Sequence, residues 1–342
     1  MIELQNDRLL VSFPELHPDA RCAIGFQRTL RIPDDNRTYP LPAGLGHFPL
    51  HHVDDFANNV PRQWLERGGV FLPMYQSEAL WIHFGGGSGY PFAIKIAAGK
   101  INAVSGRDWT SGLEGSPQNY VVAPGQPWLD GFSVQKGLVR QFVAMPLGEG
   151  FTTEEQLTGE PRHGGLQIQV FPMRRECYEE FLKRRVWKSD VDAICLGILS
   201  IRKEIDGDRR MIDMGLAPGG LMGQEIYEDP HGLAAWDTTR TARCFVHLVN
   251  SAVYRQITNC APPIEPITAE RYREAGIPWF EYYAGDAKAL EGAPRLAELD
   301  SVAAMTIKKG GKDTQPVVLV DDAKIVKLRP RSTGMVREGT AW

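Results

Sequence analysis

Three histidines and two aspartates stand close together in the segment HFPLHHVDD at residues 47–55. Three of the eight histidines in the chain fall within six positions of this segment. Neutral imidazoles and carboxylates are ligands that suit Zn²⁺, Fe²⁺ or Mn²⁺. The segment therefore raises the hypothesis of a site for one transition metal per chain. The candidate ligands are His47, His51, His52 and Asp54.

The spacing of these residues also allows a second interpretation. It matches neither HExxH nor a zinc-finger pattern, and Pro49 opposes a helix here. On an extended backbone His47 and His51 share one face, whereas His52 points the other way. The alternative is a loop whose histidines hydrogen-bond to backbone or water, and the sequence leaves both interpretations open.

A second group of candidate residues lies in the Gly- and Pro-rich segment 107–131 and the strand that follows it. Aromatic and polar side chains on wide loops can stack on a sugar or a nucleobase and hydrogen-bond its edge. The same side chains can simply anchor a long loop. Arg140 lies within the apolar strand. A buried arginine is unusual and is normally paired, and the candidate partners here are Glu78 and Asp130. The candidate ligand-binding residues are Trp109, Tyr120, Trp128, Asp130 and Arg140.

Other polar motifs favour structural roles. The GGGSG run at 85–89 lacks the Lys-Ser/Thr of a phosphate-binding loop and is expected to be a hairpin connection. His83 ends an apolar strand, which is typical of a hydrogen-bonded strand-end histidine. Cys244 and His247 lie three apart on a predicted strand, so their side chains should point to opposite faces.

The elements that must position these residues are mainly strands. Leu166, Ile168 and Val170 alternate with glutamines, which predicts a strand with one buried face. Residues 138–145 are apolar on both faces, which predicts an interior strand covered on two sides. Between the two strands, residues 152–156 can begin a helical turn. Many such strands with Gly/Pro turns predict a mainly β (α+β) fold, an antiparallel β-sandwich or barrel-like core with peripheral helices and an extended C-terminal tail.

The domain organisation follows from where the helices and aromatic residues lie. Helical patterns gather in an insertion near residues 174–210, and the strand predicted at 242–250 returns to the sheets. We therefore expect a single β-rich domain over residues 1–283. Residues 284–341 hold no aromatic side chain, which argues against a core of their own. We therefore expect residues 284–342 to form an extended, partly ordered basic tail.

Charge is distributed unevenly between these two parts. Residues 308–342 hold eight Lys/Arg and four Asp/Glu, a net charge of +4 within a chain whose net charge is −4. Short β-prone stretches at 317–320 and 324–328 would be aggregation hazards if they were exposed. The sequence therefore predicts that this tail docks on its own body or on a second copy of the chain, forming a homo-oligomer in the latter case.

Composition sets limits on the class of function. The net charge of −4 gives no case for a nucleic-acid partner, and the longest apolar run is too short for a membrane span. Five scattered cysteines and the absence of a signal-peptide pattern favour the cytoplasm. The leading interpretation is a soluble, non-enzymatic binding or assembly protein whose ligand the sequence does not identify. The alternative is a metal-dependent enzyme using the histidine cluster.

Overall fold

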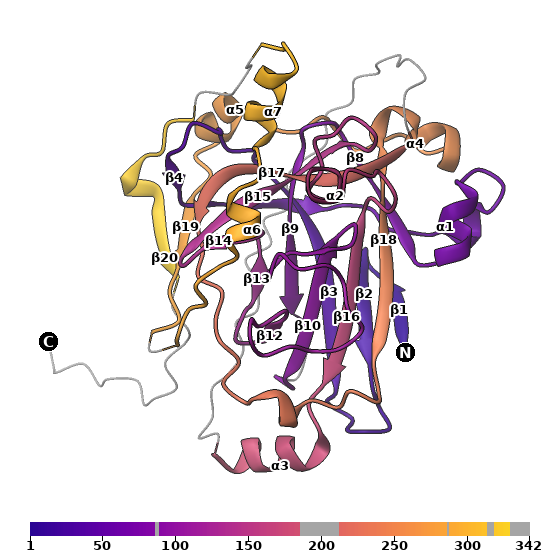
Figure 1. The fold of residues 1–342 in the computed structure, drawn as a ribbon, viewed down its shortest axis with the longest axis vertical. Helices are drawn as coiled ribbons and strands as arrows, with labels where there is room; N and C mark the ends of the chain where they lie inside the picture. Colours follow the sequence, from indigo (N-terminus) through magenta and orange to yellow (C-terminus); the bar gives the residue numbers. More distant parts are fainter. Residues whose placement is uncertain (86–88, 185–211, 286, 313–317, 329–342) are drawn as a thin grey trace, which may run out of the picture.

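A computed structural model of the chain describes residues 1–85, 89–184, 212–285, 287–312 and 318–328 (Figure 1). It is mainly β, as the alternating patterns predict. A sheet of 17 strands folds back on itself, so that two layers face each other across one apolar core. The β-sandwich prediction is confirmed, together with its peripheral helices.

The first layer consists of strands from the N-terminal part of the chain. Its members are β1 (Ile2–Gln5), β2 (Arg8–Ser12), β3 (Arg21–Thr29), β6 (Gly44–His47), β9 (Ala79–Gly85) and β13 (Trp128–Leu129). All their pairings with one another are antiparallel, with β2, β3 and β9 side by side. Odd and even positions of each strand therefore face the core and the outer surface in alternation.

The second layer is built around three long antiparallel strands in the order β10, β16 and β18. Its members are β7 (His51–His52), β8 (Val70–Met74), β10 (Phe92–Ala98), β11 (Ile101–Asn102), β12 (Val121–Ala123), β16 (Leu166–Pro172) and β18 (Ala242–Asn250). Phe13 and Phe92 meet across the core with ring centres 6.2 Å apart. This contact is one of many that join the two layers.

A third group of four strands connects the layers, mainly through its two longest members. The connecting group consists of β4 (Thr38–Tyr39), β14 (Gly131–Gln135), β15 (Leu138–Pro146) and β17 (Asp213–Gly223). β15 pairs with β9 of the first layer and with β17, and β17 pairs with β18 of the second. Figure 1 shows β15 and β17 crossing the upper end of the sandwich.

The predicted interior strand at 138–145 is covered on both faces, as expected. Phe142 faces the main core, while Val143 and Met145 form a smaller core with Phe151 and Val302. The strand at 166–170 differs in one respect from its prediction. Its alternating glutamines are also buried, because Gln167 hydrogen-bonds to the Gly99 carbonyl and to Arg243.

The helices are short and lie at the periphery. They are α1 (Arg62–Arg67), α2 (Thr153–Thr158), α3 (Arg175–Arg184), α4 (Ser251–Thr258), α5 (Ala269–Glu274), α6 (Pro294–Ala297) and α7 (Val302–Lys308), with 3₁₀ turns η1 (Asp54–Phe56), η2 (Leu233–Ala235) and η3 (Asp322–Lys324). The predicted helical turn is α2, where Thr152 and Glu155 form a capping box. Residues 185–211 of the predicted insertion lie outside the described residues. No helix within the described ranges has the length and apolar composition that a membrane crossing requires.

The tail differs from the expected extended segment. Its first part carries α6 and α7, and Leu296 and Val302 are buried against the sandwich. Further along, β20 (Ile325–Leu328) pairs in parallel with β19 (Trp279–Tyr282), which also pairs with β5 (Leu41–Pro42). The tail therefore adds a strand to a small three-stranded sheet of its own chain.

A buried ion pair joins β3 to the turn before β9. Arg28 Nε donates to Glu78 Oε1 at 2.7 Å, and the two side chains are 10% and 2% exposed. Arg28 also donates to the Ile264 carbonyl, and Glu78 accepts from the backbone of Tyr75. The pair thus ties together three segments of the chain: β3, the turn before β9 and the segment at Ile264.

We predict that Arg28→Met lowers the free energy of unfolding by about 3–5 kcal/mol, because Glu78 is left buried without a counter-charge. Adding Glu78→Gln should restore part of this loss. Urea unfolding followed by circular dichroism measures both effects. Arg62→Met, in the exposed Arg62–Glu66 pair, is the control and should change little. Equal small effects in both arginine variants would contradict the prediction.

Candidate functional site

Six side chains from five strands gather on the outer surface of the first layer. They are Arg8, Gln27, His47, Trp81, His83 and Trp128, and we call them the Trp81 face. Cross-strand pairing places them together: Gln27 stands opposite Trp81 and also opposite His47. His83 stands opposite Trp128 on the neighbouring strand.

Glycines let the rings of the Trp81 face lie against bare backbone. A Cβ added at Gly25 would lie 2.9 Å from Cε1 of His47, and one added at Gly44 would lie 2.9 Å from the indole of Trp81. Both distances are shorter than real contacts of a Cβ allow. The two rings therefore occupy space that any other residue at these glycines would fill.

His47 is held in its neutral form by its neighbours. Arg8 Nε donates to His47 Nε2 at 3.2 Å, and a second guanidinium nitrogen lies 2.9 Å from the same atom. Burial, and then the charge of Arg8, lower the pKa of His47, while Asp7 acts in the opposite direction. Since a guanidinium only donates, Nε2 is the acceptor and the ring proton sits on Nδ1.

Three aromatic rings form a stepped platform at one side of the face. The ring centres of Trp81 and Trp128 are 6.2 Å apart with planes at 63°, and those of Trp128 and Tyr282 are 5.0 Å apart at 57°. All three side chains are half-buried. The indole N–H of Trp81 is buried and has no hydrogen-bond partner in the part of the chain that the structure describes.

A neutral carboxylic acid lies beneath the platform. Burial raises the pKa of Asp130 to about 8, although hydrogen bonds from the Trp128 and Gln224 side chains act in the opposite direction. Gln224 Nε2 donates to Asp130 Oδ2 at 2.8 Å. Asp130 is therefore a positioning residue that orients Trp128 from below.

The predicted metal ligands do not come together. His47 is engaged by Arg8, whose positive charge opposes a metal ion at that ring. His51 lies instead among Phe56, Phe71 and Tyr254, with Nε2 2.5 Å from the Tyr254 hydroxyl.

The other two predicted metal ligands, His52 and Asp54, are exposed. Within the described ranges, no group of three or more His, Cys, Asp or Glu side chains is arranged to hold a metal ion. The successive histidines His51 and His52 occupy neighbouring strand positions, so their side chains leave opposite faces of the sheet.

The predicted ligand-binding residues separate into four places. Trp128 belongs to the Trp81 face and Asp130 is buried next to it, whereas Trp109 lies over the outer surface of the second layer. Tyr120 is buried and donates to Asp229 at 2.6 Å. Arg140 pairs with Asp34 at 3.3 Å, because Glu78 is bound to Arg28 and Asp130 to Gln224.

Sequence reasoning missed Arg8, Gln27, Trp81 and Tyr282 as members of a site. One local signal was present, since Trp81 and His83 sit two apart on an apolar strand and so share its outer face. Nothing local links them to Arg8 or Tyr282, which other strands bring to the same surface.

Another polar cluster closes a turn near α2. The buried carboxylate of Glu154 accepts from the backbone N–H groups of His163 and Gly164 and lies 2.5 Å from His163 Nδ1. Because these bonds all fall within one short stretch of chain, we assign the cluster to holding the 159–165 turn.

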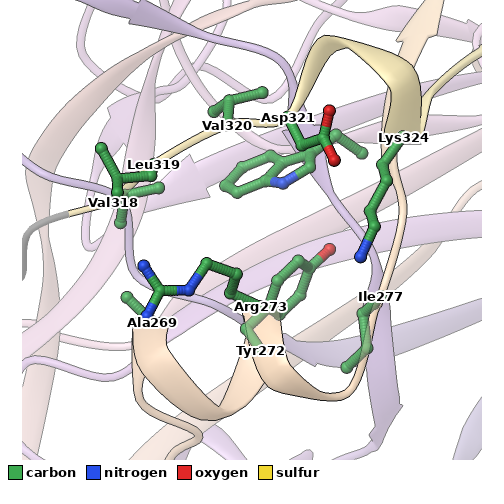
Figure 2. A pocket seen from close by; sticks show the side chains of 10 residues that line it. Ala269, Tyr272, Arg273, Ile277, Val318, Leu319, Val320, Asp321 and Lys324 are labelled. Atoms are coloured by element: carbon green, nitrogen blue, oxygen red, sulfur yellow. The ribbon is translucent and has the colours of Figure 1, made fainter.

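A small hollow lies where the tail meets the body (Figure 2). Its volume is about 140 Å³, and it is lined by Tyr272, Ile277 and Trp279 of the body and by Val318 and Val320 of the tail. Arg273 and Lys324 point into it from opposite sides in Figure 2. The hollow separates α5 and β19 from the tail segment, so it marks the docking surface of the tail.

Comparisons with known proteins identified no relative of the chain. No protein-family model matches the chain, and neither curated proteins nor solved structures gave a significant match. The geometry of the site is therefore the basis for inferring function.

The raised pKa of Asp130 implies that the free energy of unfolding depends on pH. The ordinary pKa of an unfolded aspartate is about 3.9, so protonated Asp130 stabilises the fold below about pH 4, and this stabilisation is lost as the pH rises towards about 8. In urea unfolding from pH 4 to pH 8, wild type should lose stability relative to Asp130→Asn. The slope should approach about 1.4 kcal/mol per pH unit. Parallel pH dependences of the two proteins would contradict a buried neutral acid.

Proposed function

We propose that this chain is a binding protein for a carbohydrate, which it takes on the Trp81 face. The observation that carries the proposal is the stepped platform of Trp81, Trp128 and Tyr282 beside the polar groups of Arg8 and Gln27. Aromatic rings pack against the C–H face of a sugar ring, and a guanidinium group such as that of Arg8 hydrogen-bonds its hydroxyls. The buried amide of Gln27 lies 3.0 Å from His47 Nε2 and supports that ring from behind.

The angles between the rings favour a sugar over a flat base. A nucleobase is best held in a slot between parallel rings, whereas the planes here meet at 63° and 57°. Such a surface fits a puckered ring, whose two faces are not equivalent. The unpartnered indole N–H of Trp81 adds a donor that a hydroxyl oxygen would satisfy, since an unpaired buried donor costs free energy.

The state of the polar groups supports binding in preference to catalysis. His47 is neutral, with Nε2 already accepting from Arg8. Asp130 is buried beneath Trp128, away from a ligand lying on the face. These groups fix the orientation of their neighbours, which is what a preorganised binding surface requires.

An array of immobilised neutral mono-, oligo- and polysaccharides tests the proposal, followed by calorimetric titration of the saccharides that bind. We expect wild type to bind at least one saccharide. Trp81→Ala and Trp128→Ala should each weaken that binding at least tenfold, roughly 1.4 kcal/mol or more, because stacked aromatic anchors dominate such contacts. Trp128→Phe should keep part of the affinity.

Trp109→Ala is the matched control, since it removes a half-buried tryptophan from the opposite layer, and it should leave saccharide affinity unchanged. If no neutral saccharide binds, or if Trp81→Ala binds as well as wild type, the carbohydrate proposal fails. Binding of free nucleobases at the same face would replace it with another ligand class.

We further propose an assembly role for the tail, as a homo-oligomer contact. In the described part of the chain β20 is the outermost strand of the sheet β20-β19-β5, with β19 as its partner. Val326 on this strand and Leu319 before it are 40% and 62% exposed. An apolar edge strand with an unpaired side favours adding a strand from a second copy.

Light scattering over a concentration series tests this role. Wild type should dimerise, and Val326→Lys should shift the protein to monomer, because a lysine on an edge strand opposes strand addition. Val326→Thr, which keeps the preference for strand structure, is the control. A wild-type monomer at every concentration would contradict the assembly role.

We also propose the cytoplasm as the compartment. The four cysteines in the described ranges, Cys22, Cys177, Cys244 and Cys260, are free thiols. Thiols of this kind persist in a reducing environment.

A further inference from the structure

A row of polar side chains crosses the outer surface of the second layer, on the far side of the sandwich from the Trp81 face. Lys95 stands opposite Gln169, and Gln169 stands opposite Arg243 on the next strand. Lys95 is fully buried, whereas Arg243 is exposed. The row therefore begins under a loop and ends at solvent.

Two aromatic rings and an amide fix the guanidinium of Arg243. Its central carbon lies 5.4 Å from the ring centre of Trp109 and 5.0 Å from that of Phe245. One terminal nitrogen donates to Gln167 Oε1 at 2.6 Å. An arginine held in this way has little conformational freedom left to lose on binding, because the plane of its guanidinium is already fixed.

The charge of Arg243 has no acidic partner among the described residues, and a second cation lies nearby. Lys95 Nζ is 4.7 Å from the same Trp109 ring and donates to the carbonyls of Thr110 and Gly112 at 2.7 and 2.5 Å. The neighbouring carboxylate of Glu114 is engaged by Arg107 at 3.4 Å and by the Thr110 hydroxyl at 3.0 Å. The local field is therefore positive, although the whole chain is acidic.

Two buried polar atoms beside Arg243 lack partners in the described part of the structure. Gln169, which is 7% exposed, has an unpaired Oε1, and the indole N–H of Trp109 is also unpaired. A buried polar atom without a partner costs free energy, so such atoms mark places where a bound group completes the bonding. The indole N–H requires an acceptor, as Arg243 does, and it is the atom that points to an oxyanion. Gln169 Oε1 requires a donor instead, which an ionised carboxylate does not supply.

We propose that Arg243 is the centre of a binding site for an oxyanion, the carboxylate or phosphate group of a small molecule. The free edge of the guanidinium donates two parallel hydrogen bonds to two oxygens of that group. Phe245 offers an apolar surface beside it for the part of the ligand that carries the anion. The proposal does not depend on the carbohydrate proposal, since the two surfaces lie on opposite layers.

The test titrates inorganic phosphate and benzoate separately into full-length ¹⁵N-arginine-labelled protein, at constant ionic strength set with sodium chloride. The side-chain Nε–H signals of the arginines are followed by NMR. We expect a saturable shift of the signal that Arg243→Lys removes, with at least one of the two probes. A stronger response to benzoate assigns the site to carboxylates, and a stronger response to phosphate assigns it to phosphates.

Arg243→Lys keeps the positive charge and loses the planar fork, so it should weaken probe binding at least fivefold by calorimetry. Arg240→Lys is the matched control. Arg240 stands three residues before Arg243 in the sequence but pairs with Asp237 at 2.7 Å, so its substitution should leave probe affinity unchanged. A wild-type response that is linear, that chloride reproduces, or that survives Arg243→Lys would overturn the proposal. Assigning the Arg243 signal requires folded Arg243→Lys. Where that variant does not fold, a wild-type titration in which no arginine signal shifts saturably overturns the proposal by itself.

Discussion

The pairing of β3 with β9 is the contact on which both the core and the Trp81 face depend. Seven residue pairs join the two strands, from Ala23 with Gly85 to Thr29 with Ala79. This register turns Ile24, Phe26, Ile82 and Phe84 into the core, and it leaves the alternate positions on the outer surface. A slip by one residue would exchange the two faces along the whole length of the pair.

The two outer surfaces share one physical design. In each, a permanently charged arginine is fixed by uncharged neighbours: Arg8 by His47 on the first layer, and Arg243 by Trp109 and Phe245 on the second. Strands hold these side chains on a rigid frame, and contacts with neighbouring rings limit their rotamers. Surfaces of this kind bind with a small entropic cost because most of the ordering has occurred on folding.

Burial controls two titratable groups, His47 on the Trp81 face and Asp130 next to it. It lowers the pKa of His47 and raises that of Asp130, so that both are uncharged near pH 7. Arg8 places a guanidinium group beside neutral His47. Neutral His47 and Asp130 are well suited to a surface that takes hydroxyl-bearing ligands, which offer hydrogen bonds and no charge.

Local sequence patterns determined the type of structure and a few of its details. The alternation at 166–170 and the apolar run at 138–145 predicted two strands correctly, because side chains on a strand repeat every two residues whatever lies next to it. The capping box at Thr152 and Glu155 was also readable, since all its atoms come from one helical turn. These features need no partner from elsewhere in the chain.

The sites were decided by tertiary structure alone. The sequence grouped His47, His51 and His52, but the fold sends them to different surroundings, because neighbouring strand positions face opposite ways and His47 and His51 belong to strands of different layers. Conversely, Arg8, Trp81 and Tyr282 are far apart in the chain and meet on one surface through strand pairing and ring contacts. A local pattern carries the periodicity of a strand and no record of which strand lies beside it, so it cannot specify neighbours that only pairing brings within about 5 Å.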